Sequence, residues 1–97
     1  MEVEEKRREI DAIDNAVVKM LSRRAAIALD LAMIKLAAGL PVLDQSRENE
    51  IVKRLSDTNP GVIDNDAIAR IYNVIFDESR RIQGEARRRL AANETGG

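Results

Sequence analysis

The sequence predicts an all-α protein of three helices, and three observations support this fold class. The chain has 97 residues, of which 44% are apolar and 34% charged, and Tyr72 and Phe76 are its two aromatic residues. Apolar residues recur at steps of three and four along most of the chain, as they do on one face of a helix. The two prolines, Pro41 and Pro60, lie in short segments that interrupt this pattern. We therefore predict a long first helix, a short second helix and a long third helix.

The first predicted helix spans residues 2–38 and contains neither glycine nor proline. Its apolar residues form a seam, which consists of Ile10, Ile13, Val17, Met20, Ile27, Leu31 and Ile34. Arg24 occupies the one seam position at which an apolar residue is missing. Gly39 and Pro41 end the helix, because glycine favours the conformation that follows a helix and proline cannot continue it.

The second predicted helix spans residues 45–57. Its N-cap candidates are Asp44 and Ser46, since short polar side chains accept hydrogen bonds from the first free amide groups of a helix. Its apolar face consists of Ile51, Val52 and Leu55.

The third predicted helix spans residues 65–91 and follows a turn at residues 58–61. Asp64 is its N-cap candidate. Its stripe consists of Ile68, Ile71, Tyr72, Ile75, Ser79, Ile82, Ala86 and Leu90. We predict one domain over residues 1–92, followed by a disordered tail over residues 93–97.

The length of the first helix predicts a dimer. At 1.5 Å per residue it reaches about 54 Å, whereas a compact chain of this size has a diameter of roughly 30 Å. The helix therefore extends beyond its own domain and leaves its seam bare unless a second chain covers it. We expect an intertwined homodimeric bundle. The alternative is a break near residues 22–24, which would give two shorter helices in a monomeric bundle.

Composition disfavours several classes of function. The net charge of −1 gives no overall attraction to nucleic acid or membranes. The chain has no cysteine, so it has neither disulfides nor a thiolate zinc site, and it has no histidine, the commonest general base and metal ligand. The N-terminus is charged, and no apolar run approaches the ~20 residues of a membrane span. We expect a soluble, cytoplasmic protein without a metal site.

Two basic residues interrupt the apolar side of the first helix. Lys35 follows Arg24 by 11 residues, so both side chains point the same way, about 16 Å apart. On the third helix, Ser79 lies in the apolar stripe and Gln83 follows it by one turn. A buried unpaired charge costs several kcal/mol, and no acidic residue on the same face would neutralise both cations. The pattern therefore predicts an anionic ligand of metabolite size in the bundle core.

Each of these residues also has an ordinary structural interpretation. An arginine in a seam can fix the register of two helices or extend its charge to solvent. A serine within a helix often bonds to the preceding turn. Arg47 and Glu48 can be surface residues of the first turn of the second helix. The ligand hypothesis therefore depends on the whole set of residues.

The set resembles the AroQ class of chorismate mutases. The resemblance covers about residues 5–90 and rests on Arg7-x-x-Ile10-x-x-Ile13-Asp14, Arg24, Lys35, Pro41-Val42-x-Asp44-x-x-Arg47-Glu48 and Ser79-x-x-x-Gln83. It implies an intertwined homodimer with two active sites. The implied reaction is the Claisen rearrangement of chorismate to prephenate, in phenylalanine and tyrosine biosynthesis. This reaction is unimolecular and uses no nucleophile, metal or cofactor.

The resemblance implies that Arg7, Arg24 and Arg47 bind the two carboxylates of chorismate and that Ser79 adds a hydrogen bond. Along one helix, Arg7 lies about 25 Å from Arg24 and about 42 Å from Lys35. One small ligand cannot contact all three residues of a single chain. We therefore expect Arg7 of the partner chain to complete each site.

The remaining residues have implied roles at the ether oxygen and the ring hydroxyl. Lys35 and Gln83 would donate to the ether oxygen, where negative charge develops as the C–O bond breaks. Glu48 and the region of Asp44 would bind the hydroxyl. Because an amide donates at any pH, Gln83 predicts no steep loss of activity between neutral and mildly alkaline pH.

Three alternatives remain open. An isochorismate pyruvate-lyase has a similar architecture and cation set, but Glu48 and the segment 41–47 favour the mutase. A non-catalytic dimerisation module explains the seam but not the polar residues. A nucleic-acid binder would use Arg80, Arg81, Arg87, Arg88 and Arg89, although arginines near a helix C-terminus also suit the helix dipole. No appended regulatory domain is evident, so nothing in the sequence indicates a built-in site for feedback by phenylalanine or tyrosine, and regulation by a separate partner enzyme stays open.

Overall fold

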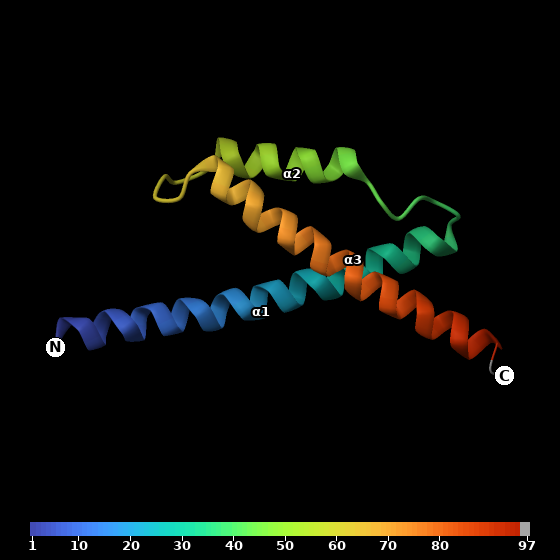
Figure 1. The fold of residues 1–97 in the computed structure, drawn as a ribbon, viewed down its shortest axis with the longest axis horizontal. Coiled ribbons are helices and arrows are strands. Elements are labelled where there is room, and N and C mark those ends of the chain that lie inside the picture. Colours follow the sequence, from blue (N-terminus) through green and yellow to red (C-terminus); the bar gives the residue numbers. More distant parts are fainter. Residues whose placement is uncertain (96–97) are drawn as a thin grey trace.

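The computed structural model describes residues 1–95, and over these residues it consists of three α-helices and no strands. They are α1 (Glu2–Ala37), α2 (Gln45–Asp57) and α3 (Asn65–Thr95). Figure 1 shows α1 and α3 crossing, with α2 lying beside the first part of α3. Both α1 and α2 contact α3. The predicted all-α class and the order of long, short and long helices are confirmed.

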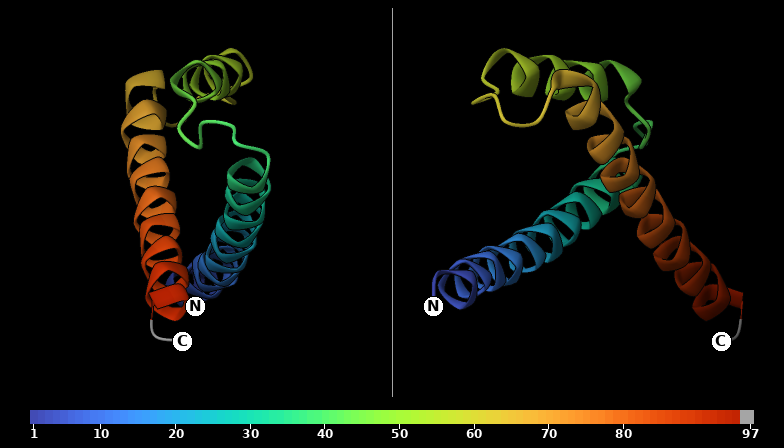
Figure 2. Two further views of the ribbon diagram at one scale, coloured as in Figure 1. Left: turned by 90° about the vertical axis from the view of Figure 1, so that its right-hand side faces the viewer. Right: turned by 60° about the vertical axis from the view of Figure 1, so that its left-hand side comes forward.

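The first helix is continuous through residues 22–24, so the alternative of two shorter helices is wrong. It comprises 36 residues and contains no residue that would interrupt its hydrogen bonding. The molecule measures 61 × 29 × 16 Å and has a radius of gyration of 17.5 Å. A compact chain of this length would have a radius near 12–13 Å. The N-terminal half of α1 extends away from the other helices (Figures 1 and 2).

Most of the apolar seam of α1 is uncovered in the single chain. The seven seam residues are 48–64% exposed. The buried apolar residues are few, namely Ala32, Ile51, Ile68 and Phe76. Burial of apolar surface is the main favourable term in folding. The single chain therefore has a small core and a large apolar face that remains in contact with water.

The helix boundaries follow from local sequence signals. Gly39 has a φ of +70°, and its amide donates to the Leu36 carbonyl while the Leu40 amide donates to that of Lys35. These bonds form a Schellman motif, which ends α1 as predicted from Gly39. Asp44 and Asp64 cap the next two helices, since their carboxylates accept from backbone amides at 2.9 and 2.7 Å. Asp44, rather than Ser46, is thus the N-cap of α2.

The C-terminal boundary differs from the prediction. The third helix continues to Thr95 instead of ending at residue 91. The reason is that no glycine or proline occurs between residue 84 and Gly96, so nothing in this stretch stops the helix. Residues 96–97 lie outside the described residues. None of the helices over residues 1–95 is long and apolar enough to cross a membrane.

Candidate active site

A pocket of about 680 Å³ lies between the C-terminal half of α1, the start of α2 and the middle of α3. It is lined by seven of the eight predicted site residues, which are Arg24, Lys35, Asp44, Arg47, Glu48, Ser79 and Gln83. Apolar side chains, among them Leu31, Ile51 and Phe76, form part of the wall. The fold thus gathers residues that are separated by up to 59 positions in the sequence.

Arg24 is half-buried and faces the aromatic residues of α3. Its guanidinium carbon lies 5.8 Å from the centroid of the Tyr72 ring and 5.5 Å from that of Phe76. The two rings contact each other edge to face, with centroids 5.8 Å apart. A cation over an aromatic face is attracted by the ring quadrupole. This contact partly compensates the charge within an apolar surface and holds it at the pocket wall.

Lys35 and Gln83 reach the pocket from α1 and α3, respectively. The Lys35 ammonium donates to the Val42 carbonyl at 3.5 Å, and the Gln83 amide donates to the Ala28 carbonyl at 3.5 Å. Both distances exceed the usual 2.7–3.2 Å of a protein hydrogen bond. These weak contacts orient the two donors while leaving them available to a ligand.

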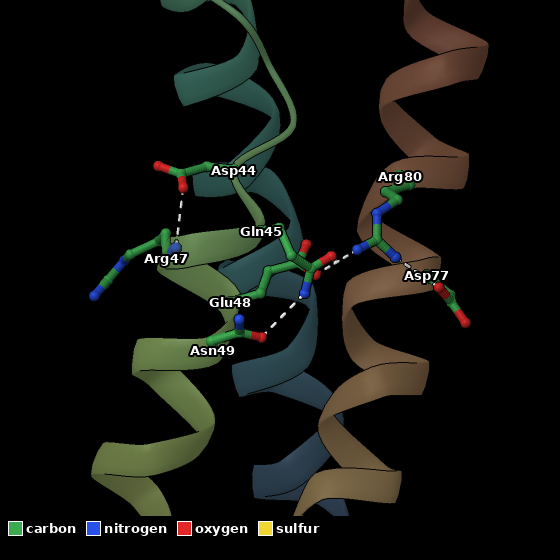
Figure 3. A network of polar contacts seen from close by, with 7 residues as sticks. All are labelled: Asp44, Gln45, Arg47, Glu48, Asn49, Asp77 and Arg80. Atoms are coloured by element: carbon green, nitrogen blue, oxygen red, sulfur yellow. Dashed lines mark hydrogen bonds and ion pairs between the residues drawn. The ribbon is translucent and has the colours of Figure 1, made fainter.

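The first turn of α2 presents an acid and a base in different directions (Figure 3). The Asp44 carboxylate accepts from the backbone amide of Arg47, which fixes the start of the helix. The Arg47 guanidinium pairs with Glu50 at 3.0 Å, and its side chain is 54% exposed. Glu48 points toward α3 and is only 18% exposed. Glu48 therefore faces the pocket, whereas Arg47 lies at its rim.

Arg80 is a pocket residue that the sequence analysis did not assign to the site. Its guanidinium pairs with Glu48 of α2 and, at 2.7 Å, with Asp77 of its own helix. Arg23 and Arg87 also line the pocket. The sequence could have identified Arg80 and Arg87 by their spacing along α3. They lie three and four residues from Gln83 and therefore share its face of the helix.

Ser79 is the buried polar residue of the pocket, with an exposed fraction of 9%. Its position in the apolar stripe of α3 thus corresponds to an inward-facing side chain. Arg7 is the one predicted site residue that this chain does not bring to the pocket. It lies on the exposed N-terminal part of α1, about 25 Å along the helix from Arg24, and it pairs with Glu4 at 3.1 Å.

The pocket is cationic, although the chain as a whole has a net charge of −1. Its basic lining residues are Arg23, Arg24, Lys35, Arg47, Arg80 and Arg87. Asp44 and Glu48 are its acidic ones. A cleft of one charge sign with apolar walls concentrates ligands of the opposite charge. The arrangement is therefore suited to a small dianion that is held by arginines and contacted by fixed hydrogen-bond donors.

The chain matches known proteins over most of its length. The family described as chorismate mutase type II matches residues 6–84. A chorismate mutase of Methanocaldococcus jannaschii is 30% identical over 78 residues, which cover 79% of each protein. A bifunctional chorismate mutase/prephenate dehydratase of Aquifex aeolicus is 36% identical over 79 residues, which cover 77% of this chain and 22% of that enzyme. This chain thus spans about a fifth of the bifunctional relative.

The fold is also similar to solved structures. Form II of a chorismate mutase from Thermus thermophilus has a TM-score of 0.83 and 25% identity, and the alignment covers 87% of this chain and 96% of that one. Form I of the Thermus protein has a TM-score of 0.79 and 26% identity, with coverage of 81% and 99%. The three-helix arrangement of a single chain is therefore shared with these structures.

Proposed function

Because the chain belongs to the chorismate mutase type II family, we propose that it catalyses the rearrangement of chorismate to prephenate. The observation that carries this proposal is the cationic pocket, into which Lys35 and Gln83 project from two different helices. The chain has neither histidine nor cysteine. A unimolecular rearrangement suits such a pocket, since it requires a bound conformation and electrostatic stabilisation rather than a nucleophile.

Substrate binding is assigned to the arginines. Arg24 is held at the pocket wall by Tyr72 and Phe76, and its planar fork can bind one carboxylate with two hydrogen bonds. Arg47 has to leave Glu50 to bind the other carboxylate. Exposed ion pairs contribute only about 0–1 kcal/mol, so this exchange costs little. Ser79 adds a buried hydroxyl as a further donor.

Catalysis is assigned to Lys35 and Gln83. The C–O bond of the substrate breaks in the transition state, and negative charge develops on the ether oxygen. Donors that are already in place stabilise this charge more than they stabilise the ground state. In the single chain both donors make only long hydrogen bonds of 3.5 Å. Glu48 and the region of Asp44 are assigned to the ring hydroxyl, whose hydrogen bond a carboxylate can accept.

The proposal includes an intertwined homodimer, supported by the exposed seam of α1 and by the distance of Arg7 from the pocket. In an antiparallel pairing of two α1 helices, Arg7 of a second chain can reach the pocket of the first. Sedimentation should show a dimer. The substitution Ile13→Glu should give monomers without mutase activity, because it places a charge in the seam. Asn15→Glu, on the opposite side of the helix, is the matched control and should remain dimeric.

A product assay tests the reaction. Purified protein is incubated with chorismate and, separately, with isochorismate, and prephenate and pyruvate are quantified. The proposal predicts prephenate from chorismate and its loss in folded, dimeric Arg24→Ala and Lys35→Ala variants. Pyruvate from isochorismate without efficient prephenate formation would reassign the protein as a lyase. If neither product formed, the dimerisation module would become the leading interpretation.

The relatives agree with the proposed product. The Aquifex aeolicus protein is named as a chorismate mutase and a prephenate dehydratase in one chain. In that enzyme the second named activity consumes the product of the first. For the present chain we propose the mutase reaction alone, acting on chorismate as a small-molecule substrate.

A further inference from the structure

Arg80 and Glu48 form an unusual ion pair. Among the ion pairs of the described residues, theirs joins two helices, whereas the others connect residues three or four positions apart. Glu48 is also the most buried carboxylate of these pairs, with 18% exposure against 42–74% for the others. Both residues line the pocket. A pair at this depth is screened by solvent less than the surface pairs are.

The guanidinium of Arg80 is held at two points. Its Nη1 atom donates to Asp77 Oδ1 at 2.7 Å, and its Nη2 atom donates to Glu48 Oε1. Figure 3 shows Arg80 reaching from α3 toward Glu48 on α2, with Asp77 on its other side. A group that is anchored on both sides restricts the rotamers of the side chain to which it binds.

The pair leaves Glu48 with unused acceptor capacity. An ionised carboxylate offers about four lone-pair sites on two oxygens, and Arg80 contacts Oε1. Oε2 can therefore accept a hydrogen bond from a hydroxyl donor in the pocket. Because Glu48 is held in place before the substrate arrives, this acceptor does not lose rotamer freedom on binding.

We propose that Arg80 is a positioning residue, which holds Glu48 toward the pocket and thereby sets the affinity for the ring hydroxyl of the substrate. This inference rests on the proposed function. In the absence of Arg80, the Glu48 side chain would be free to rotate and would no longer be fixed as the acceptor. The resulting loss of substrate affinity would then depend on the ring hydroxyl, and a substrate without this hydroxyl would show no such loss.

The test compares two substrates, chorismate and the analogue that lacks the ring hydroxyl. The variants Arg80→Ala, Arg80→Lys, Glu48→Gln and the Arg80→Ala/Glu48→Gln double variant are assayed with both. A hydrogen bond to a charged group corresponds to roughly a 10- to 100-fold change in kcat/KM. We expect a loss of this size for Arg80→Ala with chorismate, mainly through KM, and less than about a twofold loss with the analogue.

The remaining variants separate positioning from a general structural role. Arg80→Lys retains the charge but not the two-point anchoring by the guanidinium, so it should recover only part of the loss. The double variant should be little worse than Glu48→Gln alone, because Glu48→Gln already removes the carboxylate charge that Arg80 pairs with. Arg81→Ala is the matched control, since Arg81 is exposed and pairs with Glu78 and Glu85 of its own helix. It should retain wild-type kinetics.

Two results would overturn the inference while the proposed function stands. One is an equal loss with both substrates in Arg80→Ala and Arg80→Lys, which would mean that Arg80 supports the fold or contacts another group. The other is unchanged kinetics in Arg80→Ala. A folded wild-type protein without mutase activity would instead refute the proposed function, and this inference with it. Circular dichroism and sedimentation of every variant show whether it folds and assembles.

Discussion

At the scale of single residues, the position of Arg24 shows how a charge can occupy an apolar seam. The aromatic rings of Tyr72 and Phe76 lie against its guanidinium at 5.8 and 5.5 Å. These rings carry no formal charge, so they orient the cation without neutralising it. The guanidinium therefore keeps its ability to bind an anion.

Arg24→Lys tests whether the planar fork is required. Lysine retains the charge but loses both the bidentate geometry and the favourable stacking on the two rings. We expect kcat/KM for chorismate to fall by roughly 10- to 100-fold, since a charge-assisted hydrogen bond is lost. Arg70→Lys, at an exposed position on α3, is the control. Equal kinetics for the two variants would remove Arg24 from the site.

Gln83 leads to a prediction about pH. Its amide needs no proton to act as a donor, so activity should change little between neutral and mildly alkaline pH. Gln83→Glu should instead be active only at acidic pH and lose activity well before neutral pH, because a glutamic acid donates only when protonated and its usual pKa is about 4.3. Steady-state rates of both proteins from acidic to mildly alkaline pH provide the measurement. A steep loss in the wild type would argue against the assigned role.

At the scale of elements, the sequence predicted the helices well wherever a local signal marks an end. Gly39, Asp44 and Asp64 act within a few residues of their own positions, and all three have the predicted capping roles. The end of α3 carries no such signal before Gly96, and the prediction failed there. A capping residue makes a helix end visible in the sequence, whereas a helix end without a capping residue is difficult to predict.

For the candidate site, the sequence predicted most of the residues but not the contacts between them. One pocket is lined by seven of the predicted site residues. Polar side chains at apolar positions of the helices and the family resemblance predicted these residues. The contact between Arg80 and Glu48 was not predictable, because these residues are 32 positions apart. Their meeting depends on how α2 and α3 pack, and this geometry is set by side chains along both helices. The aromatic partners of Arg24 were missed for the same reason.

Gly39→Ala tests the Schellman motif that ends α1 after Lys35. At a φ of +70°, alanine places its Cβ close to the backbone, so we expect a loss of about 1 kcal/mol in the free energy of unfolding. Gly39→Asn should lose less, since asparagine tolerates this conformation. Urea unfolding at one fixed protein concentration compares the three proteins. Equal stability of the alanine variant would show that the Schellman motif does not hold this end.

At the scale of the whole molecule, two observations on the single chain support the proposed homodimer. Its seam is exposed, and its Arg7 lies far from the pocket. Both features are explained by the proposed second chain, whose α1 would cover the seam and deliver Arg7. The length of α1 alone predicts a second chain, because a helix of about 54 Å cannot be covered by so small a domain.

In the proposed homodimer, each active site combines Lys35 of one chain with Arg7 of the other. The most direct test co-refolds inactive Arg7→Ala and Lys35→Ala variants in equal amounts and measures prephenate formation. Half of the dimers would be mixed, and one site of each mixed dimer would be intact, so about a quarter of wild-type activity should return. If mixing restored no activity although mixed dimers formed, Arg7 would not act across the interface, and the proposed shared active site would be wrong.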